Sequence, residues 1–68
     1  MKDNLLKNWQ IIRVFGTKYV VCGIIYNDTK KRFADGTEIH TSRIEKIDFV
    51  NGIVKTKNSI YNLDMPLG

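Results

Sequence analysis

The sequence contains little of the chemistry that most enzyme and metal-site classes need. Among its 68 residues there are one cysteine, one histidine and one proline. A single cysteine, Cys22, permits neither an intramolecular disulfide nor a zinc site built from thiolates, and a reducing, cytoplasmic setting is expected. No apolar run approaches the roughly 20 residues of a membrane-spanning helix, and residues 1–8 lack a signal-peptide core, so no membrane contact is expected.

The short length sets a second bound. A chain of 68 residues forms one small domain, which buries only about 60% of the surface of the unfolded chain. This excludes an enzyme with a separate cofactor domain and also excludes a repeat array. We expect a single domain over residues 1–68, in which residues 1–8 are a lead-in whose structure the sequence leaves open.

β-Branched residues dominate what is present. Isoleucine occurs nine times and valine and threonine five times each, whereas alanine occurs once. Branching at Cβ suits a pleated sheet, while alanine is the best helix former. Strands are predicted at residues 9–15, 19–26, 37–41, 42–50, 53–56 and 59–63, with a bulge near Glu45 or Lys46 and with Pro66 ending regular structure. The pattern is typical of an all-β fold, either a small antiparallel SH3-like barrel or a strongly bent sheet of five to six short strands.

Asn51-Gly52 is the clearest turn signal in the chain. Both residue types tolerate positive φ, as the two-residue type I′ turn of a β-hairpin requires. That turn would pair Val50 with Ile53, Phe49 with Val54, Asp48 with Lys55 and Ile47 with Thr56. Apolar residues would then face apolar residues, and an acid would face a base.

The overall charge is moderately basic. Eleven lysines and arginines against seven acids give a net charge of +4, and eight of the cations are lysine. The densest cluster is the loop segment Lys30-Lys31-Arg32-Phe33. Because cations neutralise phosphates and an aromatic ring stacks on bases, this segment and the neighbouring Arg43 form a candidate nucleic-acid site. The alternative is a solvated loop that Phe33 anchors to the core.

Small polar side chains cluster near several expected strand ends. If the last strand lies against the third, their hydroxyl, amide and guanidinium groups converge on one rim that suits an anionic or nucleotide-like ligand. The alternative is that they satisfy backbone groups of turns. The residues concerned are Thr41, Ser42, Arg43, Asn58, Ser59 and Tyr61.

Catalytic groups are sparse. Glu38 and His40 stand two apart in a predicted strand and so share one face, where they would form a pair of metal ligands or a proton relay. No second histidine completes such a set, and no glycine-rich loop precedes a helix. We expect no catalytic residues, no metal site and no cofactor, and hence a protein that is not an enzyme.

Aromatic residues are numerous for so small a core, among them Trp9, Tyr19, Tyr26, Phe33 and Tyr61. Aromatic side chains are enriched at interface hot spots. The run 19–26 is also apolar on both faces, which is typical of a strand that is central in a barrel or covered by a partner chain. Some aromatic area is therefore expected to contact a partner protein or a second copy in a homodimer.

Three stretches carry a resemblance over about the last two-thirds of the chain. They are Tyr26-Asn27-Asp28, Arg32-Phe33-Ala34-Asp35-Gly36-Thr37-Glu38-Ile39-His40-Thr41-Ser42 and Thr56-Lys57-Asn58-Ser59-Ile60-Tyr61-Asn62-Leu63. Together they resemble a group of very short, uncharacterised proteins of bacteria, phages and prophages. Accessory proteins of this size and origin are commonly inhibitors or adaptors that occupy a site on a host complex or sequester a ligand, as anti-defence proteins do.

Three hypotheses for function follow. The leading one is a non-catalytic phage or prophage accessory protein that binds a host protein assembly as an inhibitor or adaptor of the anti-defence type. The alternative is a basic small-barrel nucleic-acid-binding protein that uses residues 30–33. Nucleotide sequestration at the polar rim is the third.

Overall fold

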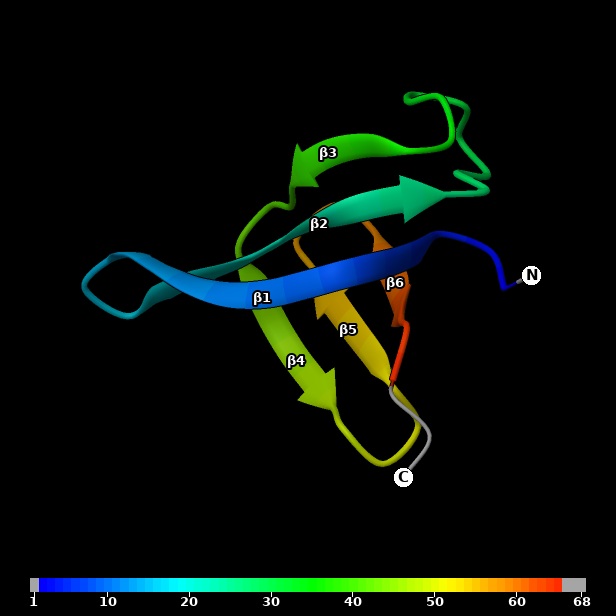
Figure 1. Cartoon of the computed structure of the whole chain (residues 1–68). Helices are drawn as coiled ribbons and strands as arrows, with labels where there is room; N and C mark the ends of the chain where they lie inside the picture. The colour runs from blue at the N-terminus through cyan, green and yellow to red at the C-terminus, as the bar shows by residue number, and fades with distance from the viewer. Residues whose placement is uncertain (1, 66–68) are drawn as a thin grey trace.

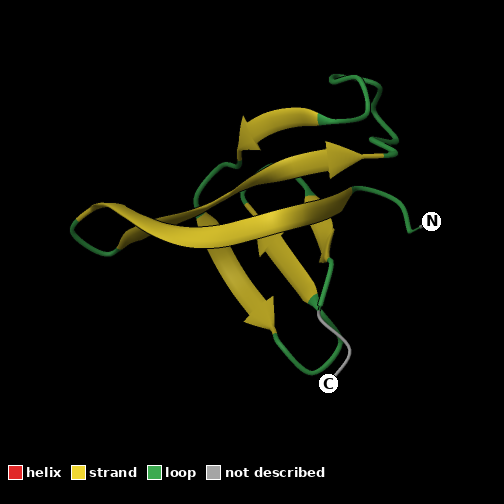
Figure 2. Cartoon of the chain, in the orientation of Figure 1, coloured by secondary structure: helices red, strands yellow, loops and turns green. Residues whose placement is uncertain are grey.

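Six strands form a single sheet that bends until its edge strand β4 approaches β2. The computed structural model describes residues 2–65, and the predicted end of regular structure at Pro66 lies outside this range. The strands are β1 (Leu5–Phe15), β2 (Lys18–Tyr26), β3 (Thr37–His40), β4 (Ile44–Asp48), β5 (Ile53–Thr56) and β6 (Ile60–Leu63). Their order across the sheet is β3-β2-β1-β6-β5-β4 (Figures 1 and 2).

The all-β prediction is confirmed, in the form of the strongly bent sheet. No helix occurs among residues 2–65. The edge strands β3 and β4 do not pair with each other, so the sheet is not closed into a barrel. Every strand pair is antiparallel except the short pairing of β1 with β6.

β1 is the strand that joins the two halves of the sheet, which are β3 and β2 on one side and β6, β5 and β4 on the other. Its first residues pair in parallel with the end of β6, while its remaining length pairs with β2 alone. The strand begins at Leu5 and not at Trp9, so residues 5–8 of the lead-in that the sequence left open are β-strand. Residues 5–8 contain no β-branched side chain, and a register shift between Lys7 and Gln10 interrupts the alternation that would have revealed the strand.

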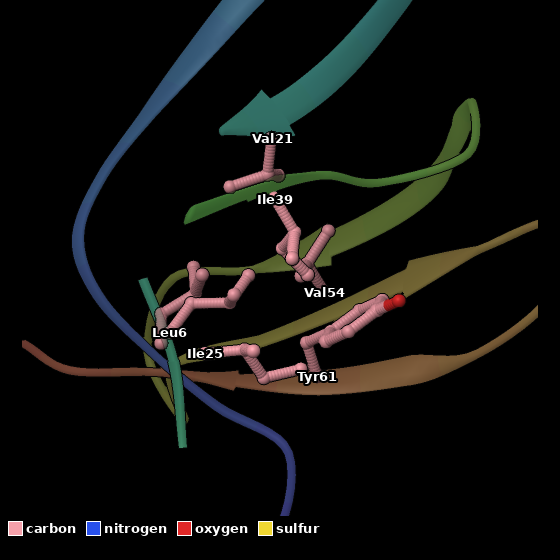
Figure 3. Packing of buried hydrophobic residues seen from close by; sticks show 7 residues of the cluster. Leu6, Val21, Ile25, Ile39, Val54 and Tyr61 are labelled. Atoms are coloured by element: carbon pink, nitrogen blue, oxygen red, sulfur yellow. The ribbon is translucent and has the colours of Figure 1, made fainter. Parts of the chain in front are cut away.

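The core lies on the inner face of the bent sheet. In β5 the buried residues are Val54 and Thr56, and in β6 they are Tyr61 and Leu63, while the residues between them are exposed or half-buried. This period of two is the pattern of strands that are covered on one face. The buried cluster, which Figure 3 shows between the two halves, consists of Leu6, Val21, Ile25, Ile39, Val54, Tyr61 and Leu63.

The predicted bulge in β4 is confirmed. The register of β4 against β5 shifts between Ile44 and Lys46. The additional residue places Ile44 and Ile47, which are three positions apart, against the same core.

The register of the β4–β5 hairpin differs from the predicted one. β4 and β5 pair Ile47 with Val54 and Asp48 with Ile53. This register is displaced by two residues from the predicted one, and residues 49–52 form a four-residue loop in place of the type I′ turn. Because a shift of two residues keeps every side chain on its own face of the sheet, Val54 still points into the core.

Asp48 accounts for the longer loop. Its carboxylate accepts hydrogen bonds from the backbone N–H groups of Val50 and Asn51 at 3.0 and 3.1 Å, and from the Asn51 side-chain amide at 2.7 Å. Gly52 alone among the four loop residues has positive φ, 64°, whereas a type I′ turn requires it at two positions. The bonds to Asp48 therefore outweigh the preference of Asn51-Gly52 for the shorter turn.

We expect the double substitution Phe49→Ser/Val50→Ser to change the free energy of unfolding by no more than about 0.5 kcal/mol. The reason is that the side chains are 54% and 94% exposed in the loop. Urea denaturation measures the effect. In the two-residue turn both side chains would belong to paired strands, so a loss of about 2 kcal/mol or more would contradict the four-residue loop.

Gly23 allows β2 to approach β1 at the position of Trp9. A Cβ atom at Gly23 would lie 3.2 Å from the Lys7 carbonyl oxygen, 3.2 Å from the Trp9 Cβ and 3.3 Å from the Trp9 Cα. The Trp9 ring packs against the core, and its Nε1–H donates a hydrogen bond to the Asp64 carbonyl at 3.1 Å. The small residue in β2 thus makes room for the indole that links β1 to the end of β6.

Gly23→Ala should lower the free energy of unfolding by about 1–2 kcal/mol, because two of the three close atoms belong to the backbone and move only with the strand. Urea denaturation with tryptophan fluorescence as the signal follows both the stability and the surroundings of Trp9. An alanine variant as stable as the wild type would show that β1 moves away from β2 at little cost.

Candidate functional site

Asp28 is the centre of the loop between β2 and β3, residues 27–36. Its side chain is fully buried. The carboxylate accepts hydrogen bonds from the backbone N–H groups of Lys30, Arg32 and Phe33 at 3.2, 2.8 and 3.2 Å. The Asp28 carbonyl oxygen accepts another from the Lys31 N–H at 2.9 Å. The basic segment of the loop is therefore wrapped around a buried negative charge.

Arg32 connects this loop to β6. Its guanidinium forms an ion pair with Asp28 at 3.2 Å. The same group donates hydrogen bonds to the Ser59 hydroxyl at 3.1 Å and to the Tyr61 hydroxyl at 3.4 Å. It also lies 5.6 Å from the centre of the Phe33 ring and 5.9 Å from that of Tyr61, within cation–π range. Arg32 is thus held by contacts within the chain.

Lys30 makes a similar connection to the turn between β5 and β6. Its ammonium group donates hydrogen bonds to the Asn58 carbonyl at 2.9 Å and to the Ser59 hydroxyl at 3.1 Å. Within residues 2–65, Lys31 alone of the three loop cations has a side chain without an ion pair or hydrogen bond. The two clusters that the sequence predicted as separate sites therefore meet in one network, in which most of the polar groups bind each other.

The polar rim assembles in part. The Thr41 hydroxyl is buried, accepts a hydrogen bond from the Val21 N–H at 3.0 Å and donates to the Ser42 carbonyl at 2.9 Å. The Ser42 hydroxyl oxygen accepts a hydrogen bond from the Asn58 amide. Thr41 thus satisfies backbone groups, which was the alternative interpretation, while Ser42 and Asn58 lie side by side as the rim requires.

The strand arrangement assumed for the rim is wrong. β6 lies between β1 and β5, and β3 is the far edge of the sheet. The reason is the parallel pairing of β6 with Leu5 and Leu6, whose sequence does not reveal a strand. Arg43 and Asn58 come near each other instead through the adjoining turns, where the Lys57 N–H donates to the Arg43 carbonyl at 3.0 Å.

The Asp28–Arg32 pair sets the electrostatics of the loop. Burial alone raises the pKa of Asp28, but hydrogen bonds from the Arg32 side chain and from the backbone of Arg32 and Lys30 outweigh it, so the pKa lies below its ordinary value. The pKa of Arg32 is raised, chiefly by its hydrogen bond to Asp28. Because these two charges neutralise each other, the loop attracts phosphates less than its sequence implies.

Asp28→Asn should lower the free energy of unfolding by about 3 kcal/mol, because it leaves Arg32 without its charged partner and turns an amide NH2 donor towards backbone N–H donors. In the wild type the Asp28 pKa is lower in the folded than in the unfolded state. The contribution of the Asp28 carboxylate to the free energy of unfolding is therefore fully present above the unfolded-state pKa of about 4. It is lost as the pH falls through the folded-state pKa.

Urea denaturation between neutral and acidic pH measures both effects. Asp28→Asn should retain only a weak pH dependence, part of it from Asp48, whose pKa is lowered by hydrogen bonds from Asn51. Glu45→Gln, which replaces an exposed acid, is the control and should follow the wild type. Equal acid sensitivity of wild type and Asp28→Asn would contradict the role of this carboxylate.

Groups with catalytic chemistry lie apart from this network. Glu38 and His40 are exposed on the edge strand β3. Burial raises the pKa of the Cys22 thiol, and the Glu38 carboxylate raises it further, so the thiol is protonated at neutral pH. In the part of the chain that the structure describes, no three histidine, cysteine or acidic side chains lie close enough to hold a metal ion.

The aromatic side chains divide between the interior and the surface. Tyr61 is buried and Trp9 and Tyr26 are half-buried, whereas Tyr19 and Phe33 are 43% and 39% exposed. The expectation of exposed aromatic area is met by two of the five residues.

A further exposed apolar area lies at the end of the β1–β2 hairpin, where Tyr19 was the one residue expected from the sequence to contact a partner. Residues 11–19, which we call the arm, form the end of the β1–β2 hairpin and lie beyond the pairing with β3 and β6 (Figure 1). The arm exposes Ile11, Val14, Phe15 and Tyr19 at 36%, 55%, 82% and 43%. The hairpin extends beyond its neighbours because β1 and β2 have 11 and 9 residues, whereas β3, β5 and β6 have four each.

Comparisons with known proteins add no assignment. No family model matches the chain, and neither a curated protein nor a solved structure matches it. Among residues 2–65 there is no helix long and apolar enough to cross a membrane. Inferences about function therefore depend on the surfaces just described.

Proposed function

We propose that this chain is a non-catalytic binding protein that occupies a site on another protein, with the arm as its main contact. The observation that carries the proposal is the exposure of the arm's apolar side chains, with Phe15 at 82%. Apolar aromatic groups form the centres of protein interfaces, where a few of them supply most of the binding energy. A projecting two-stranded hairpin also reaches into concave sites that a flat surface does not enter.

The proposed setting is that of a phage or prophage accessory protein in the bacterial cytoplasm, acting on a host assembly as an inhibitor or adaptor of the anti-defence type. Support comes from the residues that carry the resemblance. Arg32 bonds to Asp28, Ser59 and Tyr61, and all four belong to the stretches that carry the resemblance. The arm lies outside those stretches, which leaves it free to differ between proteins that bind different targets.

A homodimer through two arms is disfavoured by charge. Residues 5–26 include Lys7, Arg13 and Lys18 and no acidic residue. Two arms in contact would bring like charges together at an interface, which costs affinity. The charge instead favours a partner with a negative surface.

Nucleic-acid binding through residues 30–33 is the weaker alternative. Lys30 and Arg32 donate their hydrogen bonds within the chain, and Asp28 neutralises Arg32. Lys31 and Arg43 remain, which is fewer cations than a stable phosphate track needs. Nucleotide sequestration at the rim has the same difficulty, since the Thr41 hydroxyl binds backbone groups and the Ser59 and Tyr61 hydroxyls accept hydrogen bonds from the loop cations.

Val14→Ser/Phe15→Ser should reduce capture of a partner from bacterial lysate by at least about tenfold, as loss of a hot-spot residue does. The matched control is Phe49→Ser/Ile60→Ser, which removes apolar side chains that are 54% and 55% exposed elsewhere on the surface. Quantitative affinity capture with the tagged protein measures the effect, and light scattering gives the oligomeric state. A monomer that captures nothing, or equal loss in both variants, would refute the proposal.

A further inference from the structure

A basic groove lies beside the arm, where β4 approaches β2. It is open, has a volume of about 450 Å³ and is lined by Lys18, Ser42, Arg43, Glu45 and Lys57. These residues come from the start of β2, the β3–β4 connection, β4 and the β5–β6 turn. The bend of the sheet is what brings the four segments together, because it carries β4 towards β2.

The positive charge of the groove is not neutralised within the chain. It contains three cations and the single carboxylate of Glu45. Within residues 2–65 the only ion pair is that of Arg32 with Asp28, so none of the groove cations is held by an acid. The Ser42 hydroxyl oxygen already accepts a hydrogen bond from Asn58, which leaves its own hydrogen available to an anion.

The groove and the arm form one continuous surface. Lys18 lines the groove, and the same residue pairs with Phe15 across the end of the hairpin and precedes Tyr19. An occupant that reaches both parts meets apolar side chains next to unpaired cations. This combination, an apolar centre with a charged margin, is that of a protein–protein interface.

We propose that the groove binds acidic side chains of the protein that the arm contacts, an inference that rests on the function proposed above. A nucleic-acid strand fits less well for two reasons. No aromatic residue lines the groove to stack on a base. In addition, the Glu45 carboxylate would repel the phosphates of a nucleic acid, which are negative along the whole strand. A protein surface places a hydrogen-bond donor opposite Glu45 and acidic side chains opposite the three cations.

An NMR titration of the labelled full chain tests this inference without the natural partner. The probes are a short poly-L-glutamate and a poly-dT oligonucleotide of equal formal charge. Poly-L-glutamate should shift the amide signals of Lys18, Arg43 and Lys57 and should lose affinity as salt is added. The oligonucleotide should bind more weakly at the groove at the same salt concentration.

The groove variant is Lys18→Gln/Arg43→Gln/Lys57→Gln, which should bind poly-L-glutamate about tenfold more weakly, as expected for three exposed charge pairs. The control is Lys31→Gln/Lys46→Gln/Lys55→Gln, which changes exposed lysines outside the groove and likewise lowers the net charge from +4 to +1. The control should lose less than about twofold, because distant exposed charges are screened. All six side chains are free of hydrogen bonds within residues 2–65, so both variants should fold.

Three outcomes would overturn the inference. One is equal loss in the groove and control variants, which would mean that only net charge matters. Another is shifts spread over the whole surface, and the last is tighter binding of the oligonucleotide at the groove, which would identify a nucleic-acid site.

The arm variant separates this inference from the proposed function. Val14→Ser/Phe15→Ser should lose the partner in affinity capture and still bind poly-L-glutamate, because it keeps every groove residue. If the groove variant captures the partner as well as wild type does, the groove assignment fails and the arm remains the contact. If no variant changes capture, the proposed function fails.

Discussion

Burying a carboxylate away from water during folding costs several kcal/mol of free energy unless hydrogen-bond donors of the protein replace the lost water. Asp28 has a fully buried side chain, and its donors are three N–H groups of its own loop and the guanidinium of Arg32. Arg32 in turn reaches Ser59 and Tyr61 in the other half of the sheet. One buried charge thereby determines the shape of the longest loop and joins the two halves at a place where no strands pair.

The same constraint decides which charges remain available to a partner. Of the three cations closest together in the sequence, Lys30 and Arg32 fold against the β5–β6 turn and Asp28. Lys18, Arg43 and Lys57 are dispersed along the chain and have no acidic partner within residues 2–65. Local charge density is therefore a poor guide here, because the densest cluster adjoins the acid that compensates it.

Most features set by neighbouring residues were predictable, with the exception of the loop that Asp48 lengthens, whereas features set by distant residues were not. Alternation placed the strand at 53–56 where β5 lies, and its interruption located the bulge of β4. The parallel pairing of β1 with β6 and the contacts of Arg32 with β6 join residues far apart in the sequence, which no local pattern specifies. The spacing of four between Asp28 and Arg32 was the one local sign of the network.

An isolated two-stranded hairpin is marginally stable in water. The arm keeps its shape because β1 and β2 continue from it into the paired and buried part of the sheet. The groove is fixed to the same frame, since Lys18 belongs to β2 and the Lys57 N–H bonds to the Arg43 carbonyl. Because both parts are held in place before binding, few additional groups lose conformational entropy when a partner binds. A small contact area is then enough for affinity. To engage the arm and the groove together, a partner must then present its acids at a matching distance from its apolar centre.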